Sequence, residues 1–215
     1  MKKLTVLSGA AAALVAGAAS AGGGLAPWID QGWYNSLGVH STTNTNYITG
    51  KLGADIYHNF GVFDLSSFSG QAVAATVSIF QPSGGFSGPN AVYNMWTYEG
   101  SISDLVNATG NTLNTFADLA NGSMIASINI GAGTNGTTVN INLNAAGLAY
   151  LTSKFGGQVA LGGALVYDGQ QANHYSFGFS GAAQWQLFID TEIPAPGALA
   201  LLGLAGVTAR RRRRA

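Results

Sequence analysis

Short runs of alternating apolar and polar residues constrain the fold of this chain more than any other feature. In the run 138–143, apolar Val139, Ile141 and Leu143 alternate with Thr and Asn side chains. Successive side chains of a β-strand point to opposite faces, so this pattern predicts a half-buried strand. The same period groups Val73, Ala75, Val77 and Ile79 on one face of a second run, and sets Trp185, Leu187 and Ile189 opposite Gln184, Gln186 and Phe188 in a third.

Further strand candidates follow one another at short intervals and are separated by Gly, Asn and Ser turns. The best helix signal is 144–154, where Asn144 is suited to cap the first turn and Gly156 to end the helix. Single helical turns are expected at 102–107 and 115–120. The remaining strand candidates are Ile56–Leu65, Val92–Glu99, Ser123–Ile130, Gln158–Val166 and His174–Phe179.

Many short strands with few helices predict an all-β fold. We expect a jelly-roll-like β-sandwich of short antiparallel strands, with one inserted short helix near 144–155. A closed β-barrel is the alternative. The chain has 31 Gly and no Cys, so tight turns are readily formed, and no disulfide, thiolate nucleophile or Cys-based metal site is available.

The first 21 residues have the three parts of a secretory signal peptide. A positive start of two lysines is followed by an apolar, Ala-rich run to residue 18. Ala19 and Ala21 then form a small-x-small cleavage site, which makes Gly22 the first residue of the mature chain. The alternative is a short N-terminal membrane anchor, but the apolar run is shorter than the roughly 20 residues of a span.

The last residues, 193–215, hold two prolines, an apolar stretch and a basic end. As a helix, the apolar stretch 198–209 covers about 20 Å, which is short of a ~30 Å hydrocarbon core. Snorkelling arginines and a thinned bilayer would let it span, with the basic end on the cytoplasmic side. The basic end consists of Arg210, Arg211, Arg212, Arg213 and Arg214.

The succession of Pro194-Ala195-Pro196, an apolar helix and a terminal Arg run resembles the PEP-CTERM sorting signal over residues 193–215. That family usually has Pro-Glu-Pro, whereas here Ala195 separates the prolines and Glu192 lies upstream. The resemblance implies processing by an exosortase-like membrane transpeptidase in Gram-negative bacteria that make extracellular polysaccharide. An ordinary C-terminal tail anchor is the alternative.

We therefore expect three parts: a signal peptide over 1–21, a β-sandwich domain over 22–190 and a sorting signal over 191–215. The formal net charge of zero is unevenly spread among them. Seven of the nine basic residues lie in the end segments, so residues 22–192 have two basic and nine acidic residues, a formal charge of 2 − 9 = −7. Phosphate binding needs clustered Lys and Arg, so nucleic acid is excluded as a partner. Charged residues make up only 8% of the chain, so uncharged polar groups must cover the surface.

Sequence motifs for chemistry are weak. The segment 131–136 matches the G-x-G-x-x-G pattern of dinucleotide sites, but a strand rather than a helix follows it, so we expect a hairpin turn. His40, His58 and His174 share no metal-ligand spacing, and we expect neither a metal nor a cofactor. A catalytic triad would have to assemble in space, for example from His174, Asp168 and a serine.

Carboxylates are sparse. Glycoside hydrolysis needs two facing carboxylates, and Glu99 with Asp104, or Asp55 with Asp64, lie close in the chain. We expect these residues to cap loops and face solvent. A calcium ion at Asp168 would need several loop oxygens, and no calcium-loop pattern supports one.

The aromatic residues are the more informative candidates. Trp28 and Trp33 lie in a polar N-terminal segment, and Trp96 and Tyr98 are expected on one face of a strand. Sugar rings stack on flat aromatic faces and hydrogen-bond to nearby amides. These four residues are therefore candidate glycan contacts, unless they fill the core instead.

Three functions remain open on the sequence. The first is a non-enzymatic exported protein at the outer cell surface or in an exopolysaccharide matrix, transiently anchored in the inner membrane by its C-terminal helix. The second is a carbohydrate-binding module that contacts extracellular polysaccharide. The third is a polysaccharide or ester hydrolase.

Overall fold

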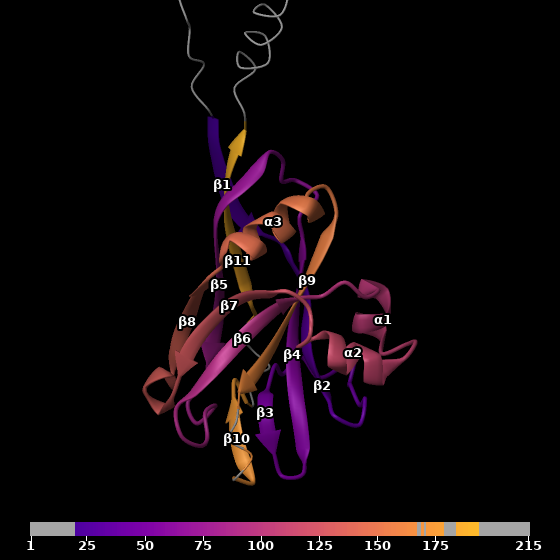
Figure 1. Cartoon of the computed structure of the whole chain (residues 1–215), viewed down its shortest axis with the longest axis vertical. Coiled ribbons are helices and arrows are strands. Elements are labelled where there is room, and N and C mark those ends of the chain that lie inside the picture. The colour runs from indigo at the N-terminus through magenta and orange to yellow at the C-terminus, as the bar shows by residue number, and fades with distance from the viewer. Residues whose placement is uncertain (1–19, 167–168, 170, 179–183, 194–215) are drawn as a thin grey trace, which may run out of the picture. The chain divides into compact units, whose positions relative to one another are not determined.

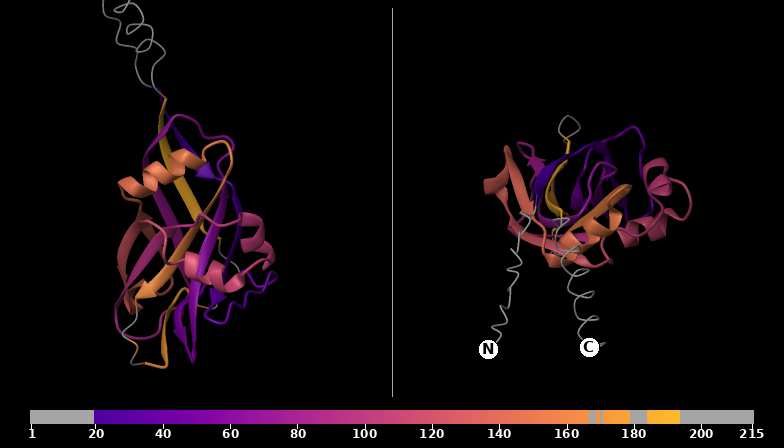
Figure 2. Two further views of the ribbon diagram at one scale, coloured as in Figure 1. Left: turned by 45° about the vertical axis from the view of Figure 1, so that its right-hand side comes forward. Right: turned by 90° about the horizontal axis from the view of Figure 1, so that it is seen from above.

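Two antiparallel β-sheets pack face to face to form the body of the protein (Figures 1 and 2). The computed structural model describes residues 20–166, 169, 171–178 and 184–193. Within those residues there are eleven strands and three short α-helices. The prediction of an all-β sandwich is confirmed, and residues Ala21–Glu192 form one unit.

The smaller sheet has four strands, and its inner face follows the predicted alternation. Leu187, Val77 and Ile141 lie opposite one another across three strands, and all three are buried. On the outer face, Asn140 and Asn142 are exposed. In spatial order, the strands are β1 (Ser20–Ala26), β11 (Gln186–Ile193), β5 (Gln71–Gln81) and β8 (Thr137–Asn142).

One part of the predicted alternation is wrong. Val73 is 42% exposed, while Ala72 and Ala75 are buried. A register shift between Asp190 and Thr191 of β11 leaves Val73 without a partner, so the face pattern changes at this bulge. The alternation within one strand contains no information about a bulge in the strand beside it.

The larger sheet has seven strands, and its central strands are buried on both faces. In β4, Phe63 joins the core between the sheets, whereas Phe60 and Val62 point to the opposite side. Residues 159–165 of β9 are likewise all buried. The strands are β10 (Asn173–Ser176), β3 (Thr49–Leu52), β4 (Asp55–Asp64), β9 (Gln158–Val166), β6 (Ala91–Thr97) and β7 (Met124–Ile130), with β2 (Trp28–Asn35) on the other edge of β4.

Trp185 is a large side chain of the core between the sheets. It is 1% exposed and its ring lies over Gly61, where a Cβ would be 2.5 Å from Cε3 of the indole. The backbone N–H of Trp185 donates to Oε1 of buried Gln31 at 2.9 Å. A glycine on β4 is therefore required for the two sheets to close around the indole.

The three short helices lie at or near the predicted helix and the two predicted single helical turns. A second buried cluster, which includes Tyr34 and Leu105, lies on the far side of the larger sheet and is covered by α1 (Ile102–Asn107) and α2 (Thr112–Asp118). The third helix is α3 (Ala145–Lys154), whose cap Asn144 accepts from the N–H of Gly147 at 3.0 Å, as predicted. Asn111 caps α2, so this helix begins before the expected 115–120.

Candidate functional site

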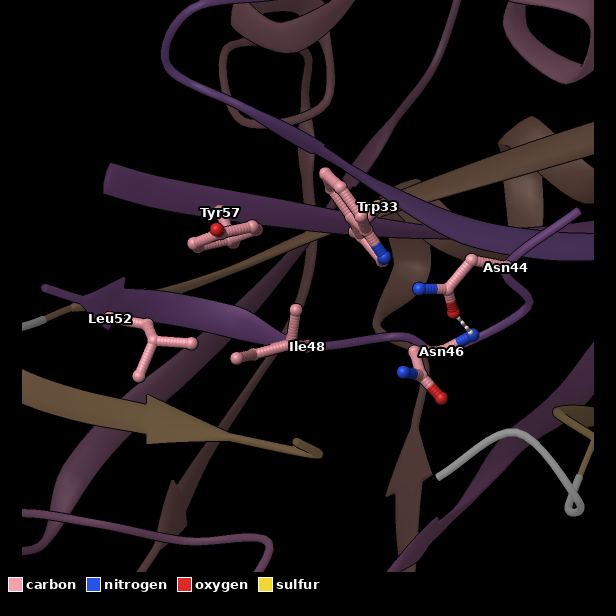
Figure 3. A pocket seen from close by; sticks show the side chains of 6 residues that line it. All are labelled: Trp33, Asn44, Asn46, Ile48, Leu52 and Tyr57. Atoms are coloured by element: carbon pink, nitrogen blue, oxygen red, sulfur yellow. Dashed lines mark hydrogen bonds between the residues drawn. The ribbon is translucent and has the colours of Figure 1, made fainter. Parts of the chain in front are cut away.

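A small pocket lies where β2, β3 and β4 meet the loop between β2 and β3 (Figure 3). Its volume is about 130 Å³. Trp33 comes from β2 and Tyr57 from β4, and their rings meet edge to face, with centroids 5.2 Å apart and planes at 68°. The full lining is Trp33, Asn44, Asn46, Ile48, Leu52 and Tyr57.

The strand register brings the two aromatic rings together. Trp33 lies opposite Asn59, and Tyr57 is two residues earlier on the same face of β4. The loop that follows β2 is fixed by His40, whose Nδ1 bonds the carbonyl oxygen of Trp33 at 2.8 Å and whose ring stacks on Tyr34 at 4.6 Å. The loop is thereby held against the strand that supplies the indole.

Two amide side chains form the polar part of the pocket. Oδ1 of Asn44 accepts from the backbone N–H of Asn46 at 3.0 Å, which closes a local turn. Among the described residues, the side-chain amide of Asn46 has no hydrogen-bond partner, so its donors and acceptor are available. Figure 3 shows the indole nitrogen of Trp33 on the same side as both amides, while Ile48, Leu52 and Tyr57 form the other side.

The pocket combines apolar walls with two side-chain amides. Aromatic and aliphatic walls accept the C–H faces of a pyranose, while amides exchange hydrogen bonds with its hydroxyls. Burial, and then the nearby Asp55 carboxylate, raise the pKa of Tyr57, so its hydroxyl stays a neutral donor. The six lining residues include no cation. A neutral ring or chain end therefore suits the pocket better than an anionic one.

The other predicted glycan contacts do not join this pocket. Trp28 is half-buried and packs on the core between the sheets. Strand β6 ends at Thr97, and Tyr98 turns into the second cluster, where it is 4% exposed. The expectation that Trp96 and Tyr98 share an accessible face is therefore wrong. The ring of Tyr98 is buried, whereas Trp96 is half-buried.

Each of the three histidines bonds a backbone carbonyl. His58 stacks on Phe116 with centroids 4.0 Å apart and bonds the carbonyl oxygen of that residue at 2.8 Å. Nε2 of His174 bonds the carbonyl oxygen of Pro89 at 2.9 Å. No group of three potential metal ligands occurs in the part of the chain that the structure describes. Asp168, named for calcium or a triad, lies outside it.

Three of the four carboxylates named as possible catalytic pairs are bonded to neighbouring groups. Glu99 forms an ion pair with Lys154 at 2.9 Å, and Asp104 accepts from the hydroxyl of Thr109 at 2.6 Å. Asp64 accepts from the N–H of Ser66 at 2.8 Å. Asp64 thus caps a turn, as the sequence led us to expect, whereas Asp104 and Glu99 bond other side chains.

The Gly-rich segment 131–136 is a turn, although not a hairpin. It contains a 3-10 turn at Ala132–Thr134 and leads from β7 in the larger sheet to β8 in the smaller sheet. Gly136 has a φ of +73° and its N–H donates to the carbonyl of Gln81 at 2.7 Å. The N–H groups that a dinucleotide would need at a helix start are not offered here.

No known protein family and no curated protein matches the chain. Of the end segments, Ala21 and Gly22 lie in β1, while Ala19, Pro194, Ala195, Pro196 and Arg210–Arg214 lie outside the described residues. No described helix is both long and apolar enough to cross a membrane.

Proposed function

We propose that this is a non-enzymatic protein exported to the outer cell surface or to an exopolysaccharide matrix. The observation that carries the proposal is the uncharged outer face of β5 and β8. Thr76 donates to Oδ1 of Asn142 at 2.9 Å and Ser78 donates to Oδ1 of Asn140 at 2.7 Å. A face made of hydroxyls and amides hydrogen-bonds to water and polysaccharide without attracting counterions.

The ends of the sequence supply the export route. The signal peptide would be cut before Gly22, and the C-terminal helix would hold the chain briefly in the inner membrane. An exosortase-like transpeptidase would then act near Pro194–Pro196, with the Arg run on the cytoplasmic side. This part of the proposal rests on the resemblance to PEP-CTERM signals.

Fractionation of the host tests the proposal. We expect the native protein in the surface or matrix fraction, and we expect a variant without residues 1–21 to remain in the cytosol. A matched variant with Asn107→Ala, an exposed change on α1, should fractionate like the parent. Recovery of the parent protein in the cytosol would overturn the proposal.

A second function, carbohydrate binding, is favoured by the Trp33 pocket. The free amide of Asn46 beside the indole is the specific observation. Loss of an aromatic contact costs about 0.5–1.5 kcal/mol beyond area burial, so Trp33→Ala should weaken binding of a neutral polysaccharide at least ~2–10-fold.

The matched control is Phe188→Ala, which removes an exposed ring from β11 rather than from the pocket. We expect this variant to bind neutral polysaccharide as the parent does in calorimetry. Binding at millimolar sugar that is lost equally in both variants, or no binding by the parent, would refute the glycan site.

A further inference from the structure

Few side chains hold β1 on the sandwich. Among the described strands, β1 pairs with β11 alone, at the edge of the smaller sheet. Residues 22–24 are exposed glycines, Leu25 is 51% exposed, and Ala26 is buried at 2%. Beyond the main-chain ladder, the hydroxyl of Thr191 donates to the carbonyl oxygen of Gly22 at 2.9 Å. The attachment of β1 is therefore mostly backbone hydrogen bonding.

β1 is also an arm at the start of the mature chain. Cleavage before Gly22 would leave residues 22–26 as a free end, and Pro27 alone separates them from β2. Because β2 pairs with β4 in the other sheet, β1 can leave without breaking any other described strand pair. Its departure would expose the N–H and C=O groups along the edge of β11, which are a template for another strand.

The edge of β11 requires a glycine at one position of the strand that pairs with it. A Cβ at Gly23 would lie 2.6 Å from Oδ1 of Asp190 and 2.8 Å from the carbonyl oxygen of Ile189, whereas nothing lies within 4 Å of a Cβ at Gly24. A side chain at position 23 would push β1 and β11 apart, since real Cβ contacts this short do not occur. The segment that suits this edge is the Gly-rich arm itself.

The acidic side chains of β11 also favour this N-terminal segment as the strand that pairs with it. Asp190 and Glu192 are exposed on β11, and the mature amino group at Gly22 is positively charged below a pH of about 7.7. An arm with this terminal charge is attracted to an acidic edge whether it comes from its own chain or from another copy.

We propose that the edge of β11 accepts residues Gly22–Ala26 of a second copy, so that copies of this protein associate by exchanging β1. The proposal rests on the proposed export, since signal cleavage frees the arm, and it names the partner within a matrix. Exchange reproduces the contacts already present, so a high local concentration favours it. Reciprocal exchange closes a dimer, whereas sequential exchange extends an open chain.

A cross-linking experiment between two copies tests the exchange. The chain has no Cys, so a Gly22→Cys copy with a mass tag and a Thr191→Cys copy can be joined by one disulfide alone. A Cβ at Gly22 lies 3.3 Å from Oγ1 of Thr191, within reach of that bond. The exported chains are mixed in mild detergent, and we expect a cross-linked heterodimer whose yield rises with concentration.

The control copy is Asn107→Cys, exposed on α1 and away from the β1–β11 pair. Cross-linking of the tagged copy to Thr191→Cys no faster than to this control would overturn the proposal. Adding Gly23→Ala to the tagged copy should lower the yield several-fold, whereas adding Gly24→Ala should leave it unchanged. Equal yields for these two variants would also overturn it.

The outcome is separable from that of the proposed function. Specific cross-linking by a protein found in the cytosol would refute the matrix location and leave strand exchange standing. A matrix protein that shows control-level cross-linking would refute exchange alone.

Discussion

The buried hydroxyl of Tyr93 gives a quantitative test of the core. Tyr93 and Asn59 are both 0% exposed, and the hydroxyl donates to Oδ1 of Asn59 at 2.9 Å. Nδ2 of Asn59 in turn donates to the carbonyl oxygen of Tyr47 at 2.9 Å. Burial raises the pKa of Tyr93, so its phenol remains a neutral donor. The substitution Tyr93→Phe therefore leaves a buried acceptor without this donor.

An unsatisfied buried acceptor costs about 1–3 kcal/mol. For a chain of this size that free energy lowers Tm by roughly 2–12 °C. Thermal and urea unfolding followed by circular dichroism would measure it. The matched control is Tyr57→Phe at the half-buried pocket ring, which should stay within about 0.5 kcal/mol of the parent. If Tyr93→Phe were as stable as the control, the hydrogen-bond argument would be refuted.

Three further predictions concern pH, packing and ligand binding. Burial lowers the pKa values of His40 and His58 in the folded protein. Below a pH of about 6.5 the unfolded chain therefore binds more protons than the folded chain, and the unfolding free energy should fall from pH 7.5 to 5.5. An unfolding free energy that stays constant over this range in urea titrations would contradict this. Gly61→Ala forces a Cβ against a buried indole and should cost about 1–3 kcal/mol in urea unfolding, whereas Gly133→Ala meets open space and should be neutral; equal effects would be inconsistent with the packing. Millimolar NAD should not shift Tm, because segment 131–136 is a turn between sheets, and stabilisation by NAD would disprove that interpretation.

The sequence predicted strands well where one face is apolar and the other polar. In β8, Val139 and Ile141 are buried while Asn140 and Asn142 are exposed, as the alternation indicated. The strands buried on both faces, such as β9, were also found because long apolar runs between turns mark them. Helix ends were readable where an Asn cap precedes an apolar run, as at Asn144.

The sequence did not reveal β1, β2 and β3. In β2, the polar residue Gln31 is 2% exposed because its side chain bonds the carbonyl of Thr45 and the N–H of Trp185. Those partners are distant in the chain, so a local pattern reads Gln31 as a surface residue. In β1, three glycines provide no side-chain pattern at all.

The sequence did not reveal the pocket, although it named one of the lining residues as a candidate glycan contact. Trp33 was named, but Asn44, Asn46 and Tyr57 reach it only through the strand register and the turn of the β2–β3 loop. The Thr- and Asn-rich stretch 42–46 marks a loop in the sequence, and nothing local shows which ring it faces. The alternation did not predict the burial of Tyr98, because β6 ends one residue before it and the side chain turns into the second cluster.

Mass spectrometry of the terminal peptides, from protein recovered from its own host, tests the proposed export most directly. We expect a mature N-terminus at Gly22 and the loss of everything after about Ile193. An intact N-terminal segment, or a C-terminus that still has the five arginines, would contradict export followed by sorting at the C-terminal signal.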